Sequence, residues 1–121
     1  AVSDVYQILK ENQIQKGVIH CFTLEKIWAE KFLGLGLHLG FTGIVTYKNA
    51  DLVQESAKIV PVEKILIETD CPYLSPQKYR GQRNEPSYVV EVAKKISEIK
   101  NLSLDKVAEQ TTKNAEKLFN I

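Results

Sequence analysis

The segment at residues 65–74 constrains the fold of this chain most, because an apolar run leads directly into two acidic residues. It reads Ile-Leu-Ile-Glu-Thr-Asp-Cys-Pro-Tyr-Leu. A short apolar run that a proline ends is typical of a buried strand in a parallel sheet. Carboxylates at the exit of such a strand are costly to bury unless they bind a cation or a partner. Since α/β proteins place their chemistry at the carboxyl ends of their strands, Asp70 is the first candidate functional residue.

Apolar runs and helical spacings alternate along the rest of the chain. Strands are predicted over 17–22, 37–41 and 64–68, and helices over 2–12, 24–35 and 49–58. In the third helix Asn49 is the predicted N-cap and Leu52 is predicted to face inward. The segment 42–48 reads as a loop or a short strand extension. After a long connection over 70–86, a helix begins at Pro86.

The last part of the chain is predicted to be helical, with Ser103 capping a shorter helix and a final helix running to about Phe119. Strands that alternate with helices indicate parallel βαβ units, whose right-handed crossovers bring all carboxyl ends to one face. Three strands are few for an open sheet, and the first helix has no strand before it. The pattern therefore favours the later part of a TIM (β/α) barrel, whose usual length is about 250 residues.

Composition sets broad limits on location and partners. The 121 residues suggest one domain, and a hydrophobic content of 44% is enough for a core. A net charge of +1 neither demands nor excludes nucleic acid as a partner. No apolar run or leader pattern directs the chain to a membrane, and Cys21 and Cys71 read as reduced thiols, so a cytoplasmic location is expected. Because the chain lacks Met and opens on Ala1, we expect a piece of a longer product.

Three residues at the predicted carboxyl ends suggest a metal site. His20 is predicted to be the penultimate residue of a buried strand, where a histidine is more often hydrogen-bonded in the core than a metal ligand. Asp70 alone could cap the following turn. Glu68 and Asp70 would lie on the same side of a continuing strand, and two carboxylates close together invite a cation. An imidazole with carboxylates is half of a divalent-metal site. His38 lies at the wrong end of its strand and is expected to be partly exposed there.

A basic loop follows Asp70 in the sequence. Lys78, Arg80 and Arg83 could contact phosphate, and Tyr73 or Tyr79 could stack on a base. An ordinary solvated loop whose arginines pair with nearby acids is the alternative interpretation. Its position beside Asp70 favours contact with a substrate.

Five stretches together resemble the TatD family of metal-dependent deoxyribonucleases, over nearly the whole chain and in order. They are residues 18–22 (VIHCF), 40–50 (GFTGIVTYKNA), 68–74 (ETDCPYL), 80–86 (RGQRNEP) and 112–119 (TKNAEKLF). The resemblance implies a partial TIM barrel of the amidohydrolase type, with residues 1–121 forming the C-terminal part of one TatD-like hydrolase domain. The opening His-x-His pair, the bridging Glu and an earlier His of the family are absent, because they belong to strands that would precede Ala1.

The resemblance also implies roles for individual residues. His20 and Asp70 match metal ligands of the family, and Asp70 would also orient or deprotonate the attacking water. Glu68 matches a motif residue that would support the ligands rather than bind the metal. Arg80, Arg83 and Asn84 match motif residues that would hold the loop or touch phosphate. Two divalent ions per complete enzyme are expected, with Mg²⁺, Mn²⁺ or Zn²⁺ all open.

The resemblance implies a hydrolase that cleaves phosphodiester bonds of DNA when complete, and the missing ligands predict that the fragment is inactive by itself. Two alternatives remain open at this point: an aminoacyl-tRNA deacylase using the same metal centre, and a non-catalytic half-barrel. A half-barrel has two open strand edges. We therefore expect it to pair with the missing N-terminal half or with a second copy of the chain.

Overall fold

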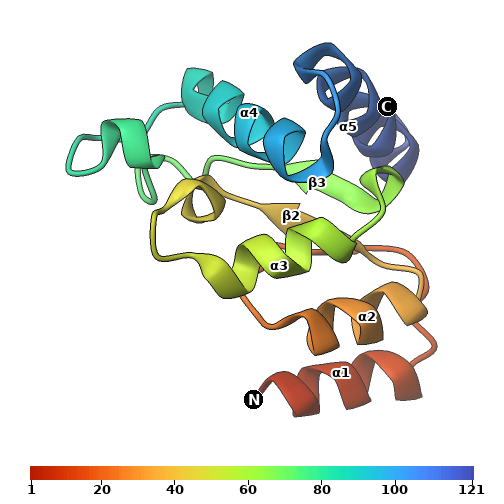
Figure 1. Cartoon of the computed structure of the whole chain (residues 1–121). Coiled ribbons are helices and arrows are strands. Elements are labelled where there is room, and N and C mark those ends of the chain that lie inside the picture. The colour runs from red at the N-terminus through yellow and green to blue at the C-terminus, as the bar shows by residue number, and fades with distance from the viewer.

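The computed structural model describes residues 1–121 as an α/β fold around one parallel sheet (Figure 1). Its three strands are β1 (Val18–Ile19), β2 (His38–Phe41) and β3 (Ile65–Ile67). They lie in chain order, with Val18 beside His38 and Leu39 beside Ile65. A helix connects each strand to the next, so the predicted parallel βαβ arrangement is confirmed.

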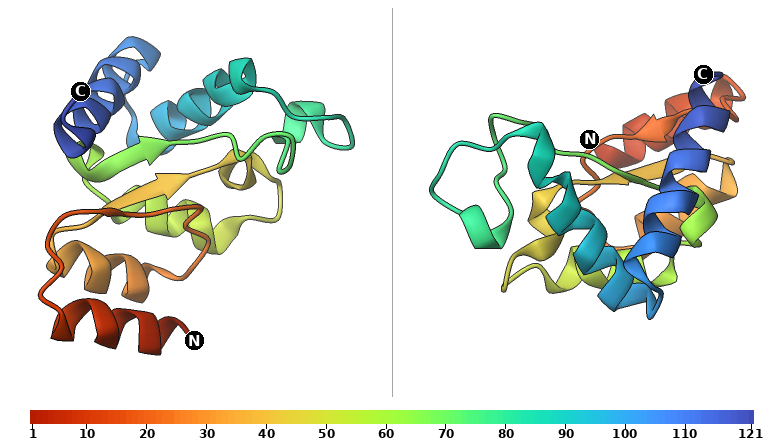
Figure 2. Two further views of the ribbon diagram at one scale, coloured as in Figure 1. Left: turned by 180° about the vertical axis from the view of Figure 1, so that it is seen from behind. Right: turned by 90° about the horizontal axis from the view of Figure 1, so that it is seen from above.

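The helices follow one another around the sheet, as Figures 1 and 2 show. They are α1 (Val2–Glu11), α2 (Lys26–Gly34), α3 (Asp51–Ile59), α4 (Val89–Lys100) and α5 (Leu104–Phe119). Helix α2 packs on α3, α3 on α4 and α4 on α5. The ring of Tyr6 joins α1 to α2 by meeting Trp28 and Phe32 edge-on, with centroids 6.3 and 6.0 Å apart. None of these helices has both the length and the hydropathy that crossing a bilayer requires.

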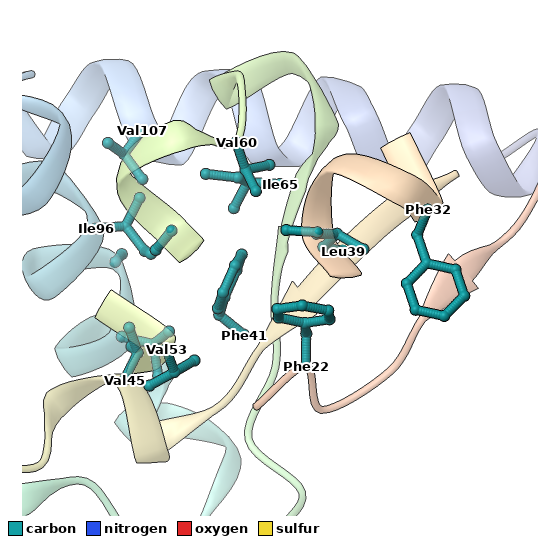
Figure 3. Packing of buried hydrophobic residues seen from close by; sticks show 14 of the residues in the cluster. Phe22, Phe32, Leu39, Phe41, Val45, Val53, Val60, Ile65, Ile96 and Val107 are labelled. Atoms are coloured by element: carbon teal, nitrogen blue, oxygen red, sulfur yellow. The ribbon is translucent and has the colours of Figure 1, made fainter. Parts of the chain in front are cut away.

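One face of the sheet packs against the helices and forms the core (Figure 3). Side chains alternate along a strand, so Leu39 and Phe41 point toward the helices together with Ile65, and all three are fully buried. Phe22 meets Phe41 edge-on at a centroid distance of 6.0 Å. Each such side chain contributes on the order of 1.5–3 kcal/mol by burial, which fixes the register of the short strands. His38 and Gly40 therefore point to the opposite face, away from this cluster.

Several predicted elements differ in extent from the observed ones. The predicted strand over 17–22 is only two residues long, because the chain turns immediately after Ile19. The segment after β2 is neither a loop nor a strand extension: it forms a 3₁₀ helix, η1 (Gly43–Thr46). Asn49 does not cap α3, since that helix begins at Asp51 after Ala50, with no side-chain cap. Leu52 is 57% exposed, so the prediction that it faces inward is wrong.

The C-terminal region is simpler than predicted. Ser103 is the N-cap, and its hydroxyl accepts a hydrogen bond of 3.1 Å from the amide of Lys106. One continuous helix, α5, then runs to Phe119, so the expected division into two helices is wrong. The start of α4 is as predicted, because Pro86 begins a short 3₁₀ helix, η4 (Pro86–Tyr88), that leads directly into it.

The two ends of the sheet are covered differently. The loop over residues 70–88 lies at the carboxyl ends of the strands, and α5 lies across the opposite end (Figure 2, right). A third short 3₁₀ helix, η2 (Val62–Lys64), precedes β3 at that amino end. It packs against α5, where the amide of Asn114 donates to the carbonyls of Val62 and Ile65, both at 2.8 Å. His38 at this end is only 8% exposed, so the expectation of partial exposure is wrong.

Candidate metal centre

The three candidate residues from the carboxyl ends of β1 and β3 meet in the structure. His20 lies just beyond β1 in a turn, and its side chain is 58% exposed, so it is not the buried strand residue that the sequence predicted. Its two ring nitrogens face different carboxylates. Nδ1 lies 2.5 Å from Oε2 of Glu68, and Nε2 lies 3.5 Å from Oδ1 of Asp70.

Glu68 is the more enclosed of the two carboxylates, with its side chain 16% exposed. Its Oε2 also accepts a hydrogen bond of 3.1 Å from the backbone N–H of Cys21. The carboxylate lies directly over Gly40 of β2, where a Cβ would stand 1.8 Å from Oε1. Gly40 therefore provides the space that Glu68 occupies. Because Nδ1 of His20 faces Glu68, a neutral ring that carries its proton on Nδ1 keeps the lone pair of Nε2 on the side of Asp70.

Asp70 and His20 together can serve as two ligands of one cation. Two donor atoms that each lie about 2.0–2.2 Å from an ion are at most about 4.4 Å apart, and the observed 3.5 Å falls within that limit. The Asp70 side chain is 39% exposed, which leaves access for water and substrate. No three His, Cys, Asp or Glu side chains of the chain converge as ligands. Since Glu68 is committed to Nδ1, the chain offers a partial donor set that fits a divalent ion and needs further ligands.

The backbone at both strand exits is left-handed. Cys21 has a φ of 51° and Asp70 a φ of 57°. Such conformations cost on the order of 1–3 kcal/mol in residues other than glycine and are concentrated at functional sites. Here the turn at Cys21 directs its N–H to Glu68, and the turn at Asp70 follows the end of β3. The expected alternation of a continuing strand is therefore not what brings the two carboxylates to His20.

The thiol of Cys21 is close to this centre but is not an activated nucleophile. Its Sγ lies 3.8 Å from Oγ1 of Thr42. Burial raises the pKa of the Cys21 thiol; the contact with Thr42 opposes this rise, and the carboxylates of Asp70 and Glu68 add to it. The thiolate, which is the reactive form, is therefore disfavoured. Both cysteines are free, as expected for reduced thiols.

Asn84 fixes the loop that follows the metal centre. It is 2% exposed, and its amide nitrogen donates to the carbonyls of Thr69 and Tyr73, both at 2.7 Å. Its backbone N–H donates to Pro72 O at 3.1 Å. Of the two roles considered for Asn84, its buried contacts support holding the loop, because the amide is used on the backbone around Asp70. A direct contact with substrate would require these bonds to break.

The other predicted contact residues are exposed on the loop that follows the centre in the chain. Tyr73 is 72% exposed. Arg83 borders a hollow of about 510 Å³ that also includes Cys71 and Pro72, directly after Asp70. Arg80 stacks on the ring of Tyr47, with its Cζ 4.1 Å from the centroid, beside a second hollow of about 400 Å³ that includes Tyr73. Both hollows include Pro72, so the three side chains border neighbouring hollows of the loop that follows Asp70 in the chain.

Two residues of this region were not expected to matter. Gly40 has a role only because Glu68 occupies its side-chain space, and Tyr47 only because Arg80 stacks on it. Neither contact joins residues that are close in the sequence. The glycine inside a strand is nevertheless a signal, because it weakens a strand and often marks close approach by another group.

Comparison with known proteins gives this geometry its context. A family model described as TatD related DNase matches residues 1–120. The chain belongs to that family. The resemblance in the five sequence stretches is thereby confirmed.

Relatives with similar sequences are described as metal-dependent hydrolases. An uncharacterized metal-dependent hydrolase of Buchnera aphidicola is 46% identical over 123 residues, which cover 100% of this chain and 46% of that protein. The uncharacterized metal-dependent hydrolase YabD of Bacillus subtilis is 45% identical, with coverage of 100% and 48%. The chain thus spans about half the length of these relatives.

Solved structures confirm the fold class. YjjV of Escherichia coli, described as a TatD homolog, superimposes with a TM-score of 0.92 at 28% identity, covering 99% of this chain and 47% of that one. A TatD family hydrolase of Entamoeba histolytica gives a TM-score of 0.83 at 26% identity, covering 96% and 46%. The prediction of a partial TIM barrel of the amidohydrolase type, with parallel strands and flanking helices, is confirmed.

Proposed function

We propose that this chain contributes half of the active site of a divalent-metal-dependent hydrolase that cleaves phosphodiester bonds of DNA. The observation that carries the proposal is the arrangement of His20, whose Nδ1 is held by Glu68 and whose Nε2 faces Asp70. Relatives named as metal-dependent hydrolases support the reaction class. The DNase in the family's description supports DNA as the substrate.

Each residue of the centre has a separate task in this proposal. His20 Nε2 and Asp70 Oδ1 bind the ion, and Glu68 holds the proton on Nδ1 so that Nε2 keeps its lone pair. A bound divalent ion supplies Lewis-acid chemistry, lowering the pKa of water and neutralising charge on phosphoryl oxygens. The exposed oxygen of Asp70 can accept a proton from the attacking water. Enclosure of Glu68 against Gly40 keeps that carboxylate out of this exchange.

The surface next to Asp70 suits a nucleic-acid strand. Arg83 and Arg80 offer guanidinium groups for phosphates at two hollows, and exposed Tyr73 offers a ring on which a base can stack. Together they give cations and an aromatic face at two hollows that share Pro72, a combination that binds single-stranded nucleic acids. This arrangement supports a contact role for Tyr73, Arg80 and Arg83.

The incomplete donor set implies a partner chain segment. The sheet order leaves β1 and β3 with one unpaired edge each. Such edges readily pair with other strands. We propose that an N-terminal half-barrel covers them and brings the remaining ligands, with two ions in the complete enzyme; a second copy of this chain is the other candidate partner.

A chimeric barrel tests the proposal. The half of the Bacillus subtilis relative that the chain does not cover, which we propose is its N-terminal half, is expressed with this chain, either fused or mixed. Labelled single-stranded DNA is then incubated with Mg²⁺ or Mn²⁺, with and without EDTA. We expect chelator-sensitive cleavage by the completed barrel and none by the chain alone. In a parallel assay an aminoacyl-tRNA replaces the DNA as substrate, and cleavage of its ester bond is measured.

Asp70→Asn should abolish cleavage by the completed barrel while leaving its far-UV circular dichroism unchanged. Asp105→Asn, the same substitution at an exposed position in the first turn of α5, should leave the rate unchanged. Full activity of the Asp70 variant would refute the role of Asp70. Cleavage of the aminoacyl-tRNA ester without cleavage of DNA would favour a deacylase over a nuclease. No cleavage of either substrate would favour a non-catalytic half-barrel.

A further inference from the structure

A third hollow lies at the amino ends of the strands, at the end of the sheet opposite His20 and Asp70. Its volume is about 540 Å³, within the range of small-molecule sites. Segments that precede each strand and one side of α5 form its walls. The charged and polar groups that matter most are Lys16, His38, Lys64, Lys113 and Lys117. The hollow shares no lining residue with the metal centre.

The charge of this hollow is largely uncompensated. Glu63 is the one carboxylate among its lining residues, against four lysines. Lys113 is paired with Glu109 at 2.6 Å. Lys64 donates to the carbonyl of Gly36 at 3.0 Å and has no acidic partner, and neither Lys16 nor Lys117 forms an ion pair in the chain. At least three ammonium groups therefore remain available to an anion.

His38 adds an independent observation. It lies 92% buried on the wall of the hollow, and its Nδ1 is enclosed without any hydrogen-bond partner. Buried polar atoms are nearly always paired, and an exception calls for a physical explanation. Burial, followed by the ammonium groups of Lys64 and Lys117, lowers the pKa of the His38 imidazole. Burial and these two ammonium groups therefore both favour the neutral ring, and an anion in the hollow would offset the part that comes from the lysines.

We propose that this hollow binds a small anion that carries phosphate groups. Lysine ammonium groups act as point charges for phosphate oxygens, and a neutral imidazole can donate one N–H to them. The volume admits a nucleoside monophosphate as well as free phosphate. Because the site lies at the opposite end of the sheet from the metal centre, it binds ligand independently of hydrolysis.

The first test follows His38 by nuclear magnetic resonance in the full 121-residue chain. Inorganic phosphate and adenosine 5′-monophosphate are titrated separately, with sodium chloride at matched ionic strength as the control. We expect saturable shifts of the His38 ring signals with both phosphate compounds and none with chloride. Bound phosphate should also move the titration midpoint of His38 to higher pH, because it offsets Lys64 and Lys117. Absence of a saturable shift up to 10 mM phosphate, a concentration that would detect even ~mM affinity, overturns the proposal.

Charge variants test whether the shifts come from this hollow. The pair Lys16→Gln and Lys117→Gln should raise the dissociation constant at least about tenfold, a loss of about 1.4 kcal/mol. The pair Lys10→Gln and Lys26→Gln removes the same charge from exposed positions outside the hollow and should change it less than about twofold. Arginine at residues 16 and 117 should restore binding. An equal loss of phosphate affinity in both glutamine pairs would show that phosphate responds only to the net charge of the chain, and would overturn the proposal.

The completed barrel provides the decisive comparison, because an N-terminal half could fill the hollow. Retained phosphate binding in the chimeric barrel supports the site, and loss of binding there overturns it. Tighter binding of the nucleotide than of phosphate identifies a nucleotide as the ligand that supplies the phosphate group, and equal binding identifies the free phosphate ion as the ligand. Neither readout depends on DNA cleavage, so failure of this proposal and failure of the nuclease proposal are separate results.

Discussion

Replacing Gly40 by alanine should damage the metal centre without touching any ligand directly. The new Cβ would stand 1.8 Å from Oε1 of Glu68 and 2.5 Å from its Cδ. Side-chain Cβ atoms essentially never approach closer than 3.0 Å, so the carboxylate must retreat by about 1.2 Å. That retreat lengthens the contacts of Oε2 with His20 Nδ1 and with the N–H of Cys21, now 2.5 and 3.1 Å.

The cost can be worked from these two contacts. A hydrogen bond to a charged group contributes about 1.5–3 kcal/mol, and an outer partner of a metal-binding histidine is worth about 10–100-fold in metal affinity. We therefore expect Gly40→Ala to weaken binding of Mn²⁺ by about 10–100-fold, or about 1.4–2.7 kcal/mol. Titration calorimetry on the chimeric barrel measures this directly. Far-UV circular dichroism checks that the sheet survives.

Two further variants separate Glu68 from a general effect of crowding. Gly34→Ala adds the same methyl group at the end of α2, where nothing lies within 4 Å, and should leave metal affinity unchanged. Glu68→Gln removes the charge without adding volume and should lose affinity to a similar extent. In the double variant the two losses should not add, because both act on one contact. Metal affinity of Gly40→Ala within about twofold of the parent protein would refute the reasoning.

Three other predictions concern stability and follow from single contacts. Asn84→Ala leaves two backbone carbonyls unpaired and should lower the free energy of unfolding by about 1–3 kcal/mol per lost bond, measured by urea titration against exposed Asn49→Ala. Since folding lowers the pKa of His38, the unfolded chain binds more protons, so stability should fall as the pH drops below about 6.5. His38→Gln should flatten that dependence in urea titrations at pH 7 and pH 5. Ser103→Ala removes the cap of α5 and should lower the free energy of unfolding by about 1 kcal/mol, whereas Ser103→Thr should lower it less. Equal melting temperatures for the two variants would contradict the capping role of Ser103.

Local patterns in the sequence were sufficient to predict the order of strands and helices and to predict that the three site residues meet at one end of the sheet. Alternating strand and helix periodicities require parallel βαβ units, and these place residues 20 and 68–70 at one end of the sheet. Cap chemistry located the starts of α4 and α5 because Pro86 and Ser103 act through their own backbone neighbourhoods. Such features depend on residues within a few positions of one another.

Tertiary contacts account for the features that the sequence did not predict. His38 is buried because its surroundings at the amino end of the sheet include residues of α5, far along the chain. Nothing near residue 38 indicates that coverage. Asn84 was placed in the correct loop, but its bonds to residues 69 and 73 depend on how that loop folds back. The position of Asn84 in a loop predicts neither of these two hydrogen bonds.

The two carboxylates illustrate why a correct location can have a different cause. The alternation of a strand would place Glu68 and Asp70 on one side as equivalent groups. Instead β3 ends at Ile67 and the left-handed turn at Asp70 redirects the chain, so the carboxylates approach opposite nitrogens of His20. Only one of them can hold Nδ1, and it is the one enclosed against Gly40. The other stays exposed beside the free lone pair of Nε2, where an ion and water can reach it. The proposed division of tasks, with Glu68 as supporting group and Asp70 as ligand, therefore depends on the turn at Asp70, and a variant that straightens this turn should lose metal binding even with both carboxylates present.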